Sequence, residues 1–308
     1  MALSIPAIFA PYVRLELLKW DPLHENSDFI DMNWYVRSSK VNPNDADVNL
    51  VPDLVEKVAI PILRHEISHC WDVFSAKETK CAVFATNLVF RYVPVSSKAI
   101  IDLVSILCNR LSDAVANLVV PTWNTCVLST VPNAARFGSY KFGMSVRLMR
   151  NICLWNNVLS ISNLEKLALD DLLIGKILPH LRSIHSNIDD AIRTEKIVAS
   201  FSGVWTGPGI TGGRRRKLQP TVDYLMVLGR TLENRPSFSG TKALARRLKK
   251  MLVDLNKYDH ARKSQLTKLS ITMTAVCDVE FLTVNTLPLV EKVGRQKRIM
   301  KGIFKPNK

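Results

Sequence analysis

The chain has 308 residues, of which 47% are hydrophobic and 22% are charged. This composition excludes disorder throughout, because a chain of this size can bury most of its apolar surface. No apolar run reaches the roughly 18 to 20 residues of a membrane-spanning helix, so we expect a soluble protein with no membrane partner. The formal net charge of +15 comes from the last third, because residues 1–204 hold 20 basic and 20 acidic residues whereas residues 205–308 hold 22 and 7. A basic surplus confined to one region is typical of a surface for nucleic acid or an acidic protein.

The N-terminus and the cysteines indicate the cellular environment. Residues 1–13 are apolar, but they lack a basic leading region and contain Pro6 and Pro11, so they do not fit a secretory signal. The six cysteines are widely spaced, and none forms a Cys-x-x-Cys pair. We therefore expect buried free thiols in a reducing compartment.

Helical periodicity dominates the first 260 residues and predicts an all-α fold, either a helical-hairpin bundle or an irregular helical array. The clearest segment, residues 97–120, repeats apolar side chains every three or four positions and stops before Pro121. Residues 144–159 repeat in the same way and indicate a core helix. Large aromatic side chains dominate packing in such folds. The expected core anchors are Trp20, Trp71 and Trp155.

Two capping boxes predict helix starts. Ser75 is followed by Glu78 before an apolar stretch, and Ser162 is followed by Glu165 before another. In each box the hydroxyl and the carboxylate satisfy amide groups that the first helical turn leaves unpaired. We therefore expect helices to begin at both serines.

Residues 203–217 interrupt the helical pattern with glycines, a proline and then four basic residues, which predicts a mobile basic loop. Its Gly-x-Gly-x-x-Gly string does not follow a strand, so no nucleotide cofactor is expected. Helical patterns return over residues 221–232 and 241–255. We predict a helical domain over residues 1–262 and an unassigned basic tail of roughly 45 residues, 263–308.

The basic residues of the last third are candidate contacts for phosphates or an acidic partner. No base-reading motif or aromatic platform accompanies them, so the residues do not indicate sequence-specific DNA recognition. The run at residues 214–217 also fits a nuclear import signal. The candidates are Arg214, Arg215, Arg216, Lys217, Arg246, Arg247, Lys249, Lys250, Arg295, Lys297 and Arg298.

His65, Glu66 and His69 fit the H-E-x-x-H pattern of zinc metallopeptidases, in which a helix places two imidazoles on one face and a carboxylate beside the metal-bound water. The metzincin continuation fails, because Asp72 stands in place of the glycine and Ser75 in place of the third histidine. We prefer a structural helix whose half-buried apolar stripe runs on through the two histidines. No metal or other cofactor is predicted, and His65 and His69 are the candidate ligands of the less favoured alternative.

Four stretches of the sequence occur in an order that is typical of one family. They are residues 11–23 (PYVRLELLKWDPL), 54–75 (LVEKVAIPILRHEISHCWDVFS), 154–179 (LWNNVLSISNLEKLALDDLLIGKILP) and 255–261 (LNKYDHA). In this order they resemble the C-terminal domain of the GC-rich sequence DNA-binding factor (GCFC) family, which includes Pax-binding nuclear proteins and plant regulators of ploidy. The resemblance covers roughly residues 5–262, and four blocks in order are much more specific than any one block.

The resemblance implies a helical, non-enzymatic nuclear scaffold associated with transcription and with the spliceosome, in particular its late intron-lariat stage, beside a tuftelin-interacting-protein relative and a DEAH-box helicase. It also implies that residues 65–69 belong to a structural helix, because the family is not known for a metal site there. Relatives carry a long charged N-terminal half before this domain. A short paralogue and a truncated form that competes with a full-length relative therefore both stay open.

We expect an interaction protein of the nucleus whose partners are spliceosomal or transcription proteins, with the backbone of RNA or DNA as a further partner of the basic last third. The first alternative is a direct DNA-binding transcriptional regulator. The second is a zinc metallopeptidase that uses the paired histidines.

Overall fold

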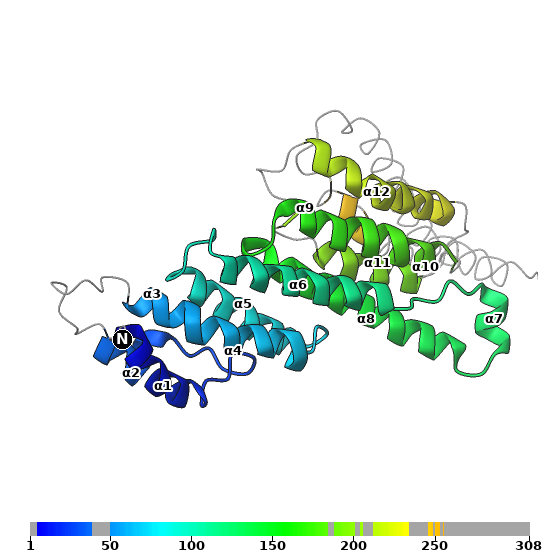
Figure 1. Ribbon diagram of the computed structural model, residues 1–308. Coiled ribbons are helices and arrows are strands. Elements are labelled where there is room, and N and C mark those ends of the chain that lie inside the picture. The colour runs from blue at the N-terminus through cyan, green and yellow to red at the C-terminus, as the bar shows by residue number, and fades with distance from the viewer. Residues whose placement is uncertain are drawn as a thin grey trace, which may run out of the picture. The chain divides into compact units, whose positions relative to one another are not determined.

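The structure of the chain is a computed structural model built of helices (Figure 1). The chain divides into two compact units, residues 1–183 and residues 184–308. No strand occurs in the described part of the chain, which confirms the all-α prediction. The predicted tail 263–308 lies outside it. The described residues are 5–38, 50–183, 188–200, 204–205, 212–233, 246–248, 250–252 and 255.

The unit of residues 1–183 consists of α-helices, short 3-10 turns and three π-helical segments. Its elements are α1 (Ile5–Leu17), η1 (Phe29–Asp31), α2 (Asn33–Ser38), α3 (Leu50–Leu54), η2 (Val55–Ala59), α4 (Ile60–His65), η3 (Glu66–Cys70), α5 (Ala76–Phe90), α6 (Lys98–Asn117), α7 (Thr125–Thr130), α8 (Ala134–Leu154), η4 (Trp155–Asn157), α9 (Ile161–Leu164), η5 (Glu165–Ile177) and α10 (Leu178–Ser183). In the unit of residues 184–308 the described helices include α11 (Ile188–Ser200) and α12 (Gly212–Glu233).

Helix α6 lies at the centre of the first unit and packs against α4, η3 and η5. Its start matches the prediction, because the Ser97 hydroxyl accepts a hydrogen bond from the Ala99 N–H at 3.1 Å. Its inner face is the predicted apolar stripe, and each buried aliphatic side chain of this kind stabilises the fold by about 1.5–3 kcal/mol. The buried residues of α6 are Ile100, Leu103, Leu107, Leu111 and Val115.

Residues 50–70 form one uninterrupted helical rod through α3, η2, α4 and η3. The π turns η2 and η3 hold more residues than an α turn, so they shift which positions face inward. The buried face continues through Leu63 and Ile67, while His65 and His69 are exposed. The prediction that the half-buried stripe runs through the histidines is therefore wrong, because it assumed α-helical spacing throughout.

The second rod, α9 to α10, is π-helical over its middle thirteen residues, η5. Its buried side chains recur every five positions, at Leu167, Leu172 and Ile177, which matches the i to i+5 bonding of a π-helix. The rod begins at Ser160, whose hydroxyl accepts from the Asn163 N–H, and not at Ser162. The capping box predicted at Ser162 is thus wrong by two residues, because Ser160 also offers a hydroxyl three residues before a free N–H.

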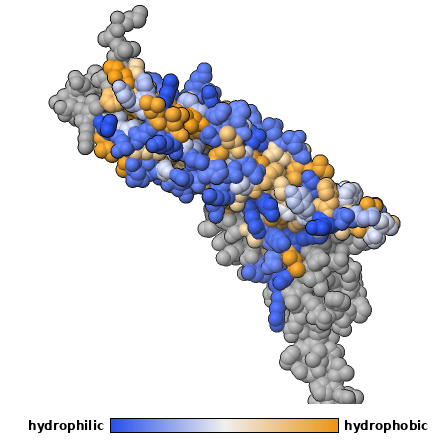
Figure 2. Space-filling view, turned by 90° about the horizontal axis from the view of Figure 1, so that it is seen from below, coloured by the Kyte–Doolittle hydropathy of each residue, from blue (hydrophilic) through white to orange (hydrophobic). Residues whose placement is uncertain are grey.

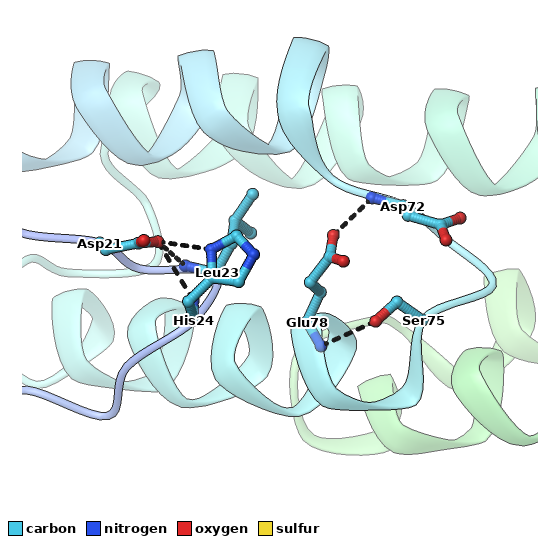
Figure 3. A network of polar contacts seen from close by, with 6 residues as sticks. All are labelled: Asp21, Leu23, His24, Asp72, Ser75 and Glu78. Carbon is cyan, nitrogen blue, oxygen red and sulfur yellow. Dashed lines mark hydrogen bonds and ion pairs between the residues drawn. The ribbon is translucent and has the colours of Figure 1, made fainter.

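The capping box at Ser75 is confirmed in one half and altered in the other. The Ser75 hydroxyl accepts from the Glu78 N–H at 3.3 Å (Figure 3). The Glu78 carboxylate, however, accepts from the N–H of Asp72 at 2.8 Å instead of from the N–H of Ser75. The carboxylate therefore fastens the connection between η3 and α5 as well as the first turn of α5.

Two tryptophans that the sequence predicted as anchors contact each other in the core. Trp71 and Trp155 are 1% and 0% exposed and meet edge to face, with ring centroids 5.5 Å apart. Polar side chains satisfy the neighbouring backbone, because Arg110 donates to the carbonyl of Trp71 at 2.9 Å and buried Asn151 donates to that of Val73 at 2.7 Å. The predicted core anchor Trp20 is also buried.

Two further predictions are corrected. The basic run at residues 214–217 lies in α12, which begins at Gly212, and not in a loop. Arginine and lysine are good helix formers, so the basic run itself is compatible with a helix. Among the described cysteines, Cys81 and Cys153 are buried free thiols as expected, but Cys70 and Cys126 are exposed because they lie on outward helix faces.

Candidate interaction surfaces

Helix α1 carries apolar side chains on two opposite faces. Val13 and Leu17 are each 1% exposed, and the helix packs against α2, α3 and η2. A helix that is apolar all round is normally buried all round. The outward side chains of α1 and of the turn after it are therefore an uncovered apolar surface, which we call the α1 surface. It consists of Ile8, Tyr12, Leu15 and Leu18, which are 50%, 69%, 65% and 79% exposed.

The α1 surface is visible as a band of apolar side chains near the N-terminal end of the unit, on the side where α1 lies (Figure 2). The exposed charges beside it are of both signs. This surface has apolar character without a dominant charge. Its charged neighbours are Arg14, Lys19, Asp21 and Glu25.

Helix α1 is fastened in place by its own carboxylate. Glu16 accepts hydrogen bonds from the N–H groups of Asn33 at 2.7 Å and Trp34 at 2.8 Å, the first residues of α2. These two N–H groups have no partner within the helix, and a carboxylate at a helix N-terminus is favourable. The α1 surface is therefore presented by an anchored helix.

The α1 surface ends at a groove of about 400 Å³. Leu18 and Trp20 line one wall, and Glu66 and Cys70 of η3 line the other. The hydrogen bond to Glu66, followed by burial and the charge of Glu66, raises the pKa of the Cys70 thiol. A raised pKa disfavours the thiolate, which is the nucleophilic form of cysteine.

Asp21 organises the turn that forms one wall of the groove. Its Oδ1 accepts from the N–H groups of Leu23 at 3.2 Å and His24 at 3.1 Å, and lies 3.0 Å from Nδ1 of His24 (Figure 3). Burial acts to raise the pKa of Asp21, but the bonds from His24 and Leu23 outweigh it, and the net shift is downward. The turn is therefore held most firmly when Asp21 is ionised.

The paired histidines stack on the outside of the first rod. The ring centroids of His65 and His69 are 4.8 Å apart, and Nδ1 of His69 lies 3.2 Å from the carbonyl oxygen of His65. Across the described ranges, no three His, Cys, Asp or Glu side chains are grouped closely enough to hold a metal ion. The structure thus brings the two candidate ligands together without a third ligand from the described residues.

Some of the predicted basic contacts are exposed as a binding surface requires. Arg246, Arg247 and Lys250 are exposed, while Leu248 and Met251 between and beside them are 0% and 2% exposed. Arg247 Nε also lies 3.9 Å from a carboxylate oxygen of Glu195, both groups being partly exposed.

The other predicted basic contacts are placed only in part. Residues 214–217 occupy the first turns of α12, where Lys217 is half-buried. The side chain of Lys249 and all of Arg295, Lys297 and Arg298 lie outside the described residues. None of the helices in the described ranges is long and apolar enough to cross a membrane.

Comparisons with known proteins identify a family and several relatives that this chain resembles. Residues 32–178 match the family described as GC-rich sequence DNA-binding factor-like protein, GCFC. The chain is 54% identical to Transcriptional repressor ILP1 of Arabidopsis thaliana over 278 residues, which cover 85% of this chain and 30% of that protein. It is 27% identical to PAX3- and PAX7-binding protein 1 of Homo sapiens over 219 residues, which cover 67% and 24%. It is 22% identical to Intron Large complex component GCFC2 of Mus musculus over 216 residues, which cover 65% and 28%.

The fold and its surfaces define an all-α helical domain with uncovered apolar and basic faces. Residues 32–178 place the chain in the GC-rich sequence DNA-binding factor-like (GCFC) family that its sequence resembles. The chain spans 24% to 30% of the length of these three relatives. Apart from His24, the residues that line the groove at the end of α1 lie in the first two blocks, 11–23 and 54–75.

The α1 surface was not predicted from the sequence, although a signal was present. Residues 5–17 are apolar at most positions, so a helical count places apolar side chains on both faces. In the sequence we considered this stretch only as a secretory signal. Its apolar pattern does not show which face is covered by the rest of the unit.

Proposed function

We propose that this chain is a non-enzymatic interaction domain in nuclear assemblies for transcription and pre-mRNA splicing. The names of its relatives support this: one is a transcriptional repressor, one a PAX3- and PAX7-binding protein, and one a component of the Intron Large complex. All three names describe regulation or assembly. The proposal carries these roles to the domain that the chain shares with them.

The observation that carries the proposal is the α1 surface. Three of its side chains are aliphatic, and covering a side chain of this kind contributes about 1.5–3 kcal/mol. The two hydrogen bonds of Glu16 to α2 already hold the helix in position, so little conformational entropy is lost when a partner binds. A pre-positioned apolar helix face of this size is typical of a protein–protein contact.

Affinity purification from nuclear extract with the full chain tests the proposal. The Tyr12→Glu/Leu15→Glu variant places carboxylates on the α1 surface without changing its buried face. The matched control, Ile101→Glu, adds a carboxylate at a 56% exposed apolar position of α6. We expect the wild type and the control to recover the same splicing or transcription proteins, and the α1 variant to lose them.

Two results would contradict this proposal. The first is recovery of the same proteins by the Tyr12→Glu/Leu15→Glu variant, which would show that the α1 surface is not used. The second is a recovered set without any protein of a transcription or splicing assembly. Circular dichroism of each variant establishes that the helices are retained.

A second candidate function is binding to the nucleic acid backbone through the basic last third. It is favoured by the exposed side chains of Arg246, Arg247 and Lys250, which project from a stretch whose apolar residues are buried. Phosphate contacts of this kind release counterions, so the affinity for duplex DNA should fall with salt at a log–log slope of about 0.9 per neutralised phosphate.

A salt titration with duplex DNA and with single-stranded RNA tests this candidate. Replacing Arg246, Arg247 and Lys250 by alanine should reduce the slope by about 0.9 for each DNA phosphate that the variant no longer neutralises. Replacing residues 214–217 by alanine tests the other basic run in the same way. Absence of binding to either nucleic acid at low salt would remove the candidate.

A further inference from the structure

A second group of uncovered apolar side chains lies in the segment before α7, at the residue that ends α7 and on the start of α8, at the opposite end of the unit from α1 (Figure 1). Three of its five side chains are aromatic. We call the cluster the α7–α8 patch. Its members are Val119, Trp123, Val131, Phe137 and Tyr140, which are 64%, 37%, 49%, 45% and 59% exposed.

The aromatic side chains of this patch form an ordered group. The rings of Trp123 and Phe137 stack with centroids 5.8 Å apart and planes 26° from parallel. The ammonium group of Lys141 lies 5.5 Å from the centroid of the Phe137 ring, a cation–π contact. Tyr140 follows Phe137 by three positions on α8, so both rings lie on the same side of the helix.

The backbone that carries Trp123 is held by side chains of the second rod. Lys176 of η5 donates to the carbonyl oxygens of Ala116 at 2.7 Å and Leu118 at 2.6 Å. The buried ring of His180 bonds through Nδ1 to the carbonyl of Pro121. Two fixed points just before Trp123 pre-organise this part of the patch, and pre-organisation reduces the entropy lost on binding.

The charged residues of the sequence stretch that contains the patch have one sign. No aspartate or glutamate occurs between Asp113 and Glu165, and the charged residues of that stretch are arginines and lysines. Arg136 is exposed on α8 next to Phe137, and Lys141 is half-buried next to Tyr140. An apolar centre with a basic rim is complementary to an apolar segment flanked by carboxylates.

We propose that the α7–α8 patch docks an acidic amphipathic segment of a partner protein. Apolar anchors of the segment cover the aromatic rings and the two valines, and its carboxylates meet Arg136 and Lys141. The inference deepens the proposed function and rests on it, because it names the chemistry of one partner. Valines gain nothing from a phosphate backbone, and the Phe137 ring is already engaged by Trp123 and Lys141, so a peptide fits this patch better than stacked bases.

A display library of random peptides, selected on the full chain, tests this inference. We expect the enriched peptides to combine Asp or Glu with Leu, Phe or Trp. Fluorescence anisotropy of an enriched peptide should show binding about tenfold weaker or worse for Arg136→Glu/Lys141→Glu and for Tyr140→Ala, because anchors and desolvated charge pairs dominate such contacts. Tyr140 is largely exposed, so its truncation leaves the fold intact.

The matched controls place the same changes elsewhere on the unit. Lys77→Glu reverses an exposed charge on α5, and Ile101→Glu changes an exposed apolar side chain on α6. Both should alter the affinity less than about twofold. The Tyr12→Glu/Leu15→Glu variant should also bind the peptide normally, so that loss of the α1 partners is distinguished from loss of the acidic segment.

Three outcomes would overturn the inference. One is a selection without acidic, apolar peptides, and another is peptide binding that the Arg136→Glu/Lys141→Glu and Tyr140→Ala variants leave unchanged. The third is a labelled twelve-nucleotide oligouridine that binds wild type and loses affinity in these variants while the peptides do not. The third result would assign the patch to single-stranded RNA instead.

Discussion

The α1 surface and the α7–α8 patch are both uncovered apolar faces of the same unit, yet they differ in charge and in construction. Beside the α1 surface, the exposed charged residues are of both signs, with two basic and two acidic side chains. In residues 114–164, which contain the α7–α8 patch, the charged residues are basic only. The first surface is one face of a helix and the turn after it, whereas the second combines a face of α8 with the segments on either side of α7.

This difference indicates two kinds of partner. Mixed charge adds little net attraction for a charged molecule, so contacts at the α1 surface depend on apolar area and shape. A basic rim attracts carboxylates and speeds their encounter, so contacts at the α7–α8 patch depend on charge as well. Under the two proposals above, the unit of residues 1–183 offers a separate surface to each of two partners.

The largest effect is expected from a core substitution that disrupts both surfaces together. Trp71→Ala empties the centre of the core, where the indole is 1% exposed and contacts Trp155 edge to face. We expect the free energy of unfolding to fall by about 3–5 kcal/mol, with binding abolished at both surfaces. Thermal unfolding followed by circular dichroism measures this, and the exposed control Leu18→Ala should leave stability nearly unchanged. Full stability of Trp71→Ala would show that the two surfaces do not depend on this core.

Salt should weaken binding at the α7–α8 patch more than binding at the α1 surface. Raising NaCl from about 0.05 to about 0.5 M shortens the screening length severalfold, so we expect the acidic peptide to bind the α7–α8 patch about tenfold more weakly. Partners of the α1 surface should change affinity less than about twofold. Anisotropy titrations and quantitative pull-downs over this range measure both. Equal sensitivity at the two surfaces would contradict the proposed difference in charge.

Loss of the Lys176 ammonium should affect one surface and not the other. Burial lowers the pKa of Lys176, and the two carbonyls at the end of α6 offset part of the cost of burying its charge. Lys176→Met keeps most of the aliphatic chain but leaves those carbonyls without a donor. We expect the free energy of unfolding to fall by about 1–2 kcal/mol. Denaturant titration measures this decrease.

Binding measurements complete the test of Lys176. The acidic peptide should bind Lys176→Met more weakly, because the backbone before Trp123 is less firmly held. The α1 surface should recover its partners as before. Lys166→Met, at an exposed lysine of the same rod, is the matched control.

The smallest expected effect is a loss of stability at low pH, caused by the turn at the end of the α1 surface. The pKa of Asp21 is lower in the folded chain than its ordinary value of about 3.9. Its ionised form therefore contributes stability in full above about pH 4, and this contribution is lost as the pH falls through the folded pKa. The difference in Tm between wild type and Asp21→Asn should be constant near neutral pH and shrink below about pH 4. A difference independent of pH would show that the charge of Asp21 plays no part in the turn.

Local rules predicted much of the fold. The serine at residue 97 and the aliphatic repeat after it specify α6 closely, because a cap and an apolar stripe are properties of neighbouring residues. The same holds for Ser75 and for the burial of Trp20, Trp71 and Trp155. The basic candidates Arg246, Arg247 and Lys250 were also correctly placed on an exposed side.

The incorrect predictions lie where the helical spacing changes, or where contact with another segment determines the hydrogen-bond partner. The π turns before and within residues 66–70 moved His65 and His69 out of the buried face, and no residue in that stretch signals a π turn. Glu78 bonds to Asp72 instead of to Ser75, since the connection before α5 folds back on the helix. The basic run 214–217 was predicted as a loop because glycines precede it, but the helix begins at Gly212 and includes Gly213.

By itself, the amino-acid sequence determined the helical class, the family, the main core residues and the concentration of positive charge in the last third, because periodicity, composition and local capping are properties of the chain read residue by residue. Only the tertiary structure decided which apolar faces stay uncovered. In the sequence, a side chain such as Tyr12 or Trp123 is equally suited to a core, and it stays exposed because the described parts of the unit do not cover it completely.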